Sequence, residues 1–142
     1  MPCASAGNCE AGGDYRDGSG RFQAFVASER NGAWRTAVEV PGSGALNKGG
    51  FAGVRSVSCA SAGICAAGGS YTDDSGHSQV FVASERNGAW RTAVEVPGSG
   101  ALNKGGDAIV SSVSCPSAGI CAAGGAYTDG SRHSQAFVVS QT

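Results

Sequence analysis

The 142-residue chain has a formal net charge of −1, 24 glycines and six cysteines. The balanced charge excludes the basic surface that recruits nucleic acid, and no apolar run approaches the ~20 residues that span a bilayer. We therefore expect no nucleic-acid partner and no membrane segment. The first residues, MPCASAGNC, contain neither a charged leader nor an apolar stretch, so no signal peptide is expected in this sequence.

The sequence repeats itself with a period of 56 residues. The 26-residue run FVASERNGAWRTAVEVPGSGALNKGG occurs identically at 25–50 and 81–106. The period divides the chain into repeat 1 (3–58), repeat 2 (59–114) and a partial repeat 3 (115–142) without a final strand, and repeats 1 and 2 differ at 11 of 56 positions. A period of this length is typical of a solenoid, a propeller or an array.

Repeat 2 contains the predicted elements in full. A strand is predicted over 54–59, with Val54 and Val57 on opposite faces, and a second over 65–71, whose small residues allow close approach of a neighbouring sheet. A polar turn at 72–77 leads to a third strand over 79–84. No window shows a sustained 3.6-residue period, so we expect no helix.

The dipeptide Asn87-Gly88 predicts a tight hairpin after the third strand. A fourth strand follows over 90–96, with Trp90, Thr92, Val94 and Val96 on one face. Pro97 ends it, and residues 98–106 form the link to the next repeat.

Four short antiparallel strands followed by a longer connection predict an all-β fold built of β-propeller-type, four-stranded antiparallel blades. The chain holds about 2.5 such repeats, counted from the sequence. A β-sandwich and a β-solenoid are the alternatives. One sheet of this composition cannot bury both faces, whereas stacking against similar sheets covers them.

The cysteines form three pairs, each separated by five residues around a Ser-Ala-Gly turn. Zinc sites prefer two or four intervening residues and a second ligand pair, so local disulfides are the better interpretation. We predict the bonds Cys3–Cys9, Cys59–Cys65 and Cys115–Cys121. Disulfides indicate an oxidising compartment, which predicts a secreted, extracellular protein and a chain trimmed from a longer exported one.

The pattern SVSCASAGICAAGG…FVASERNGAW resembles the repeats of exported actinobacterial proteins with propeller-like blades. Those repeats combine a Ser-x-Ser-Cys strand with a second cysteine six residues on and a tryptophan after a glycine turn. The hairpin also resembles the Asp-box blades of sialidase-like propellers, since Ser28, Gly32 and Trp34 match. Arg30 stands where that motif has Asp, and one residue fewer precedes the tryptophan. The resemblance implies blades and no known activity.

Four residues are candidate ligand-binding positions. Trp34 and Trp90 offer rings for stacking on a sugar, or serve only for packing. His77 and His133 lie in variable turns beside serines, without an orienting acid or an oxyanion hole, so no catalytic residue is predicted. We interpret Glu85, together with Glu29 and the arginines that follow each of them, as part of a solvated surface pair.

No metal and no cofactor are expected. The Asp-containing turns at 17–20, 73–76 and 129–131 supply one or two carboxylates each, whereas calcium takes six or more oxygens. Asp and Gly are also the residues that tight turns require.

Near-identical repeats without a unique catalytic cluster predict a non-enzymatic extracellular repeat module, acting as a scaffold or binding surface. Carbohydrate-binding, lectin-like function is the alternative, and the repeat identity also fits an engineered copy. Possible ligands are a glycan or a protein. Because incomplete repeats leave sheet faces uncovered, we expect a homo-oligomer, with a dimer as the first hypothesis.

Overall fold

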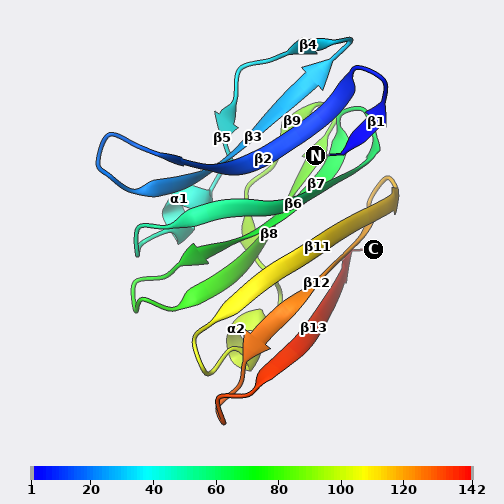
Figure 1. The fold of residues 1–142 in the computed structure, drawn as a ribbon. Helices are drawn as coiled ribbons and strands as arrows, with labels where there is room; N and C mark the ends of the chain where they lie inside the picture. The colour runs from blue at the N-terminus through cyan, green and yellow to red at the C-terminus, as the bar shows by residue number, and fades with distance from the viewer. Residues whose placement is uncertain (1, 142) are drawn as a thin grey trace.

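The computed structural model describes residues 2–141, which form three antiparallel β-sheets stacked in chain order (Figure 1). The predicted all-β class is confirmed. The sheets recur with the period of the sequence and follow one plan, but the first long strands of sheets 2 and 3 begin at the end of the preceding repeat. Sheet 1 contains β1 (Cys3–Ser5), β2 (Asn8–Arg16), β3 (Phe22–Arg30), β4 (Ala33–Trp34) and β5 (Val38–Glu39).

Sheets 2 and 3 repeat this meander. Sheet 2 contains β6 (Ala52–Ser61), β7 (Ile64–Thr72), β8 (Ser78–Arg86), β9 (Ala89–Trp90) and β10 (Val94–Glu95). Sheet 3 contains β11 (Ala108–Ser117), β12 (Ile120–Thr128) and β13 (Ser134–Gln141). In each sheet consecutive long strands pair side by side, and in sheets 1 and 2 two short strands complete the far edge.

The hairpin at Asn87-Gly88 is confirmed, because both residues have positive φ angles, 52° and 79°. The single strand predicted over 90–96 is wrong. The backbone bonds to β8 at β9 and β10 and at the residues that follow them, Arg91 and Val96. Between these two stretches the N–H of Ala93 instead donates to Pro41, in the turn after β5 (2.7 Å). Because of this break in the strand, the side chains of Ala93 and Val96 are buried, whereas the side chain of Val94 is 52% exposed.

Two single-turn helices, α1 (Ser43–Leu46) and α2 (Ser99–Leu102), interrupt the links, where we expected no helix. Each follows a glycine with a left-handed φ, and each begins with a buried serine whose hydroxyl donates to the backbone carbonyl of the valine just after β5 or β10. One turn is too short to give a 3.6-residue hydrophobic period. Neither helix, nor any other in residues 2–141, has the length and apolar character of a membrane span.

Sheet 2 packs on sheet 1 through its own first strand, β6. A Cβ added to Gly12 of β2 would collide with Val54 and lie 3.2 Å from Val57, so both valines face sheet 1. The prediction that they occupy opposite faces is therefore wrong. A register shift between Val54 and Ser56 inserts one residue, and a bulge of this kind turns the next side chain to the same face.

The other face of β6 packs against sheet 3. The hydroxyls of Ser56 and Ser58 accept hydrogen bonds from the backbone of β11, at 3.1 and 3.0 Å. Gly68 of β7 repeats the role of Gly12, since its added Cβ would lie 2.9 Å from both Val110 and Val113. We call the contact of sheets 1 and 2 junction 1 and that of sheets 2 and 3 junction 2. Residues 2–141 form an open stack, without a closed barrel or ring.

All three predicted disulfides are confirmed. They join Cys3 to Cys9, Cys59 to Cys65 and Cys115 to Cys121, and no described cysteine is free. The first two link residues that are direct cross-strand partners. Each bond therefore fixes the hairpin that begins its repeat, and the three bonds are compatible with an extracellular protein.

Candidate functional site

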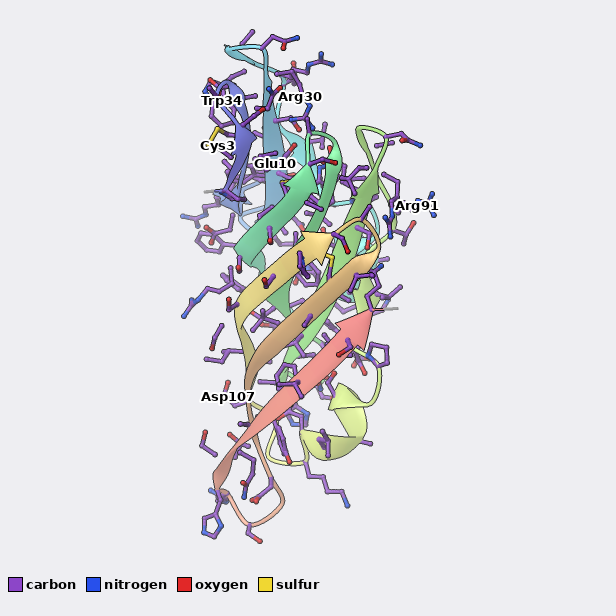
Figure 2. All side chains as sticks on the ribbon, turned by 90° about the vertical axis from the view of Figure 1, so that its right-hand side faces the viewer. Cys3, Glu10, Arg30, Trp34, Arg91 and Asp107 are labelled. Carbon is purple, nitrogen blue, oxygen red and sulfur yellow. A yellow bond between two sulfur atoms is a disulfide. The ribbon has the colours of Figure 1, made fainter. Side chains whose placement is uncertain are left out.

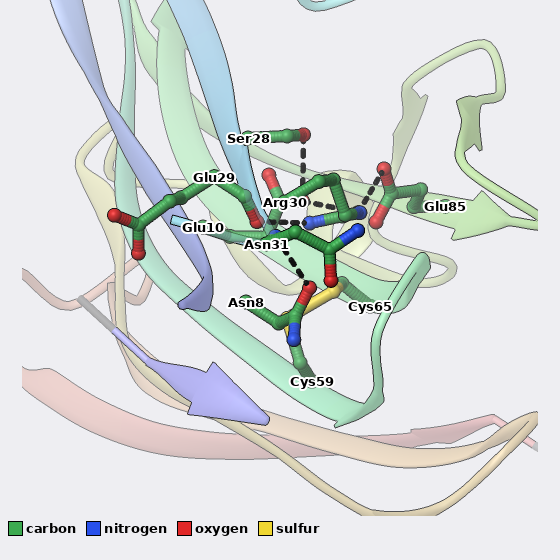
Figure 3. A network of polar contacts seen from close by, with 9 residues as sticks. All are labelled: Asn8, Glu10, Ser28, Glu29, Arg30, Asn31, Cys59, Cys65 and Glu85. Carbon is green, nitrogen blue, oxygen red and sulfur yellow. Dashed lines mark hydrogen bonds and ion pairs between the residues drawn. A yellow bond between two sulfur atoms is a disulfide. The ribbon is translucent and has the colours of Figure 1, made fainter. Parts of the chain in front are cut away.

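Junction 1 contains a buried ionic cluster of three side chains (Figure 3). Arg30, at the end of β3, lies between Glu10 of β2 and Glu85 of β8. Its Nη2 is 2.9 Å from Glu10 Oε1 and 3.4 Å from Glu85 Oε2. Ser28 also donates to Glu10 Oε1 at 2.7 Å. The cluster thus links two sheets through one guanidinium.

Both carboxylates are removed from water. Glu10 is 0% and Glu85 1% exposed, and one oxygen of each, Glu10 Oε2 and Glu85 Oε1, has no hydrogen-bond partner. Burial and the neighbouring Glu10 carboxylate raise the pKa of Glu85 to about 7, although Arg30 opposes this effect. Glu85 therefore changes its protonation state near neutral pH. Its prediction as a solvated surface residue is wrong.

The cluster does not suit a metal ion. One oxygen each of Glu10 and Glu85 and the sulfur of Cys65 lie within 4.8 Å of one another. However, the sulfur belongs to the disulfide with Cys59, so it cannot supply the thiolate that metals bind. The guanidinium of Arg30 already occupies the space between the two acids.

At junction 2 the same three positions have a different chemistry. Ala66 replaces Glu10, Gln141 replaces Glu85, and only the arginine, Arg86, is kept. Among residues 2–141 Arg86 forms no ion pair. Gln141 instead donates to Ser84 across the junction at 3.3 Å. The two junctions therefore share a backbone plan and differ in charge.

Junction 2 also contains a groove of about 380 Å³. Its apolar floor comes from both sheets and includes Val82, Val113 and Val139. Arg86 and Arg91 line the same groove. Figure 2 shows Arg91 projecting from one side of the stack, on the side opposite to Trp34. The groove can receive an apolar group, and its arginines favour a ligand without positive charge.

The structure does not bring the predicted ligand-binding residues together. Trp90 follows β8, whereas His77 precedes it, so a nine-residue strand separates them by roughly 25 Å. His77 and His133 are exposed in their turns. Trp34 is 49% exposed, and Trp90 is half-buried against the apolar core of junction 1. A common tryptophan–histidine site is therefore absent from residues 2–141.

The Asp-containing turns have a structural explanation. Asp17 accepts hydrogen bonds from the backbone of Ser19 and Arg21, at 2.8 and 3.0 Å, and from Gln23 at 3.0 Å. The bond from Gln23, followed by that from Arg21, holds the pKa of Asp17 below its usual value. Asp73 and Asp129 make equivalent bonds. Both oxygens of each carboxylate are thus used within the turn.

No known family model matches the chain, and no curated protein is significantly similar to it. The resemblance to actinobacterial and Asp-box repeats stays a prediction. The ionic cluster and the groove were missed by sequence reasoning. The alignment of the repeats did contain a clue to the cluster. One period later Ala66 replaces Glu10 and Gln141 replaces Glu85, so both acidic residues are lost together.

Proposed function

We propose that the protein is a non-enzymatic, extracellular repeat module whose stacked sheets act as a scaffold and binding surface. The observation that carries this proposal is the reuse of one junction plan, in which β6 packs on sheet 1 as β11 packs on sheet 2. A surface that repeats along a stack suits multivalent binding, whereas catalysis needs a unique arrangement of groups.

The sheets are best described as propeller-type blades. In propellers each blade is a four-stranded meander packed face to face on the next. Here the first long strands of sheets 2 and 3, β6 and β11, contact one another directly, and the short strands β9 and β10 lie at the opposite edge of sheet 2. This order supports blades over a two-sheet sandwich.

The non-enzymatic role is tested with generic chromogenic glycosides and esters. The described residues show no serine–histidine–acid arrangement, and His77 and His133 are remote from the buried acids of junction 1. We expect no turnover above that of a heat-denatured sample. Turnover that co-purifies with the folded protein would overturn the proposal.

The proposed scaffold also includes association of identical chains through an uncovered sheet face. The outer face of sheet 3 carries Val138, which is 86% exposed, and Gly124, whose added Cβ would meet only atoms of β13 beyond 3.4 Å. The corresponding face of sheet 2 is covered by β11. An uncovered face of this kind favours stacking of a further sheet, and a homodimer is the simplest assembly.

Carbohydrate binding is the second candidate, and the exposure of Trp34 favours it. An exposed indole at a hairpin can stack on a sugar ring, whereas Trp90 is half-buried. A glycan array decides between the two candidates: binding that disappears in Trp34→Ala and persists in Phe22→Ala, another exposed aromatic of sheet 1, would establish a lectin-like role. We expect a blank array.

A further inference from the structure

The β2–β3 turn, the β7–β8 turn and the links that lead into β6 and β11 lie along one side of the stack, the left side in Figure 1. Nine of the eleven positions at which repeats 1 and 2 differ lie within three residues of the turn at 17–21 or of Ala52, where β6 begins. The other two, Asn8 and Glu10, lie at the far end of β2. The repeats therefore share a backbone plan and differ mainly in the chemistry of this side.

In repeat 1 this side exposes two aromatic rings among cations. Phe22 and Phe51 are 41% and 39% exposed, and their ring centroids are 6.1 Å apart. The guanidinium carbon of Arg16 lies 5.9 Å from the centroid of the Phe22 ring. Arg21 donates to the backbone carbonyl of Asn47 at 3.2 Å, in the link before Phe51. We call the following residues the basic turn surface: Arg16, Arg21, Phe22, Lys48 and Phe51.

In repeat 2 the corresponding side is acidic. Ser78 and Asp107 replace the two phenylalanines, and they lie side by side in an isolated β-bridge. Asp74 stands in the turn where repeat 1 has a glycine. Ile109, near the start of β11, is 40% exposed and adds an apolar side chain. We call the following residues the acidic turn surface: Asp73, Asp74, Asp107 and Ile109.

The two surfaces have opposite net charge, with histidine counted as neutral. Three cations and two acids lie around the first, whereas one lysine and three acids lie around the second. In residues 2–141 none of these groups forms an ion pair, since both ion pairs there involve Arg30. The groups are, in this order, Arg16, Arg21, Lys48, Asp14 and Asp17, then Lys104, Asp73, Asp74 and Asp107.

We propose that this side of the stack is a symmetric docking surface for a second copy of the chain. The basic turn surface of each copy meets the acidic turn surface of the other, and a two-fold axis forms both contacts at once. The partner's Ile109 packs against the exposed rings of Phe22 and Phe51. This inference deepens the proposed association of identical chains and rests on it, but it uses turns and links instead of the outer face of sheet 3.

The two kinds of contact contribute differently. Single exposed ion pairs stabilise a complex little, so the apolar contact supplies most of the affinity. The opposite charges set the orientation of the two copies and disfavour contacts between like surfaces. Because exposed charges are screened by salt, we expect association to weaken between about 0.05 M and about 0.5 M NaCl.

The test reverses the charge of each surface and measures mass by sedimentation equilibrium. The base-reversed variant carries Arg16→Glu and Lys48→Glu, and the acid-reversed variant carries Asp74→Lys and Asp107→Lys. All four side chains are exposed. In either variant alone, like charges meet at both contacts of the pair. We expect the dissociation constant of the dimer to rise at least tenfold in each, with cooperative melting retained.

An equimolar mixture of the two variants distinguishes docking from misfolding. In the mixed pair, reversed acids meet reversed bases at one contact and the native surfaces meet at the other, so both contacts are again attractive. We therefore expect the mixture to form a 1:1 pair with an affinity close to that of the wild type. Misfolded variants would not regain association on mixing.

Two further variants test the apolar contact and the specificity of the charge effect. Phe22→Ser introduces the residue that repeat 2 has at this position, and we expect at least tenfold weaker association. Arg35→Glu reverses an exposed charge just after β4 and serves as the matched control, which should associate as the wild type does.

Each other outcome overturns the inference. A monomeric wild type, unchanged mass in both charge-reversed variants, or a mixture that stays monomeric would exclude this docking surface. Loss of association in Val138→Lys, together with unchanged mass in both charge-reversed variants, would assign association to the outer face of sheet 3. The non-enzymatic role fails separately, since turnover would overturn it whatever the mass of the particle.

Discussion

At the scale of single residues, Arg30 has the largest energetic consequence. It compensates two carboxylates that are buried between sheets, and removal of one partner from a buried ion pair leaves uncompensated charge. Arg86 occupies the same place in repeat 2 without any carboxylate partner in residues 2–141. Arg86 is therefore an internal control for the free-energy cost of breaking the ionic cluster.

We expect Arg30→Ala to lower the free energy of unfolding at pH 7 by about 3–5 kcal/mol, the usual cost of breaking a buried pair. The matched variant Arg86→Ala should cost about 1 kcal/mol or less, because no buried charge is left behind. Urea denaturation followed by circular dichroism measures both. Equal losses in the two variants would show that the ion pairs do not stabilise junction 1.

The raised pKa of Glu85 predicts an unusual pH dependence. Its folded pKa of about 7 exceeds the ordinary value of 4.5, so the folded state binds the proton more tightly than the unfolded state. This contribution to stability is fully present below pH 4.5 and is lost as the pH rises through 7, by up to about 3 kcal/mol. Stability measured between pH 4.5 and 7, the range bounded by these two pKa values, should fall accordingly.

Glu85→Gln should remove this decline, since glutamine keeps the shape and cannot ionise. Repeat 3 already has Gln141 at the equivalent position. The half-buried Glu29, which is outside the cluster, is the matched control, and Glu29→Gln should leave the pH profile as in the wild type. A profile that declines equally in Glu85→Gln would refute the assignment to Glu85.

At the scale of elements, glycines set how closely the sheets approach. Gly68 faces Val110 and Val113 of β11, whereas Gly124 is the same repeat position on the uncovered face of sheet 3. We expect Gly68→Ala to destabilise the fold by about 1–3 kcal/mol through overpacking. Gly124→Ala should be neutral or stabilising by up to about 1 kcal/mol, because alanine restricts the unfolded chain.

Thermal denaturation of these two variants reports on the stacking of sheets. If Gly68→Ala and Gly124→Ala melt at the same temperature, β11 does not pack on β7 as described. Both variants must first show the wild-type far-ultraviolet spectrum, so that a global misfold is not mistaken for a local clash.

The sequence predicted the elements that depend on local chemistry. The strands predicted over 65–71 and 79–84, the Asn87-Gly88 turn and the cysteine pairs depend on neighbouring residues, and all are confirmed. It could not predict the bulge beside Val54 or the break at Ala93, because contacts with another sheet produce both. The ionic cluster joins residues 75 positions apart, Glu10 and Glu85, so only the three-dimensional structure shows it.

At the scale of the whole molecule, the stack formed by residues 2–141 is open at both ends. Sheet 3 presents its outer face and the edge of β13, and on sheet 1 the exposed residues include Phe22 and Trp34. Apolar surface and unpaired strand edges together favour association of chains. Our central proposal is that these sheets act as blades that present such surfaces to partners, the first of which is another copy.

Size-exclusion chromatography with multi-angle light scattering, over a range of micromolar concentrations, tests this claim most directly. We predict a particle whose mass is a multiple of 14.0 kDa and increases with concentration towards a dimer or larger assembly. A cooperatively folded species that stays at 14.0 kDa throughout the range would contradict the claim.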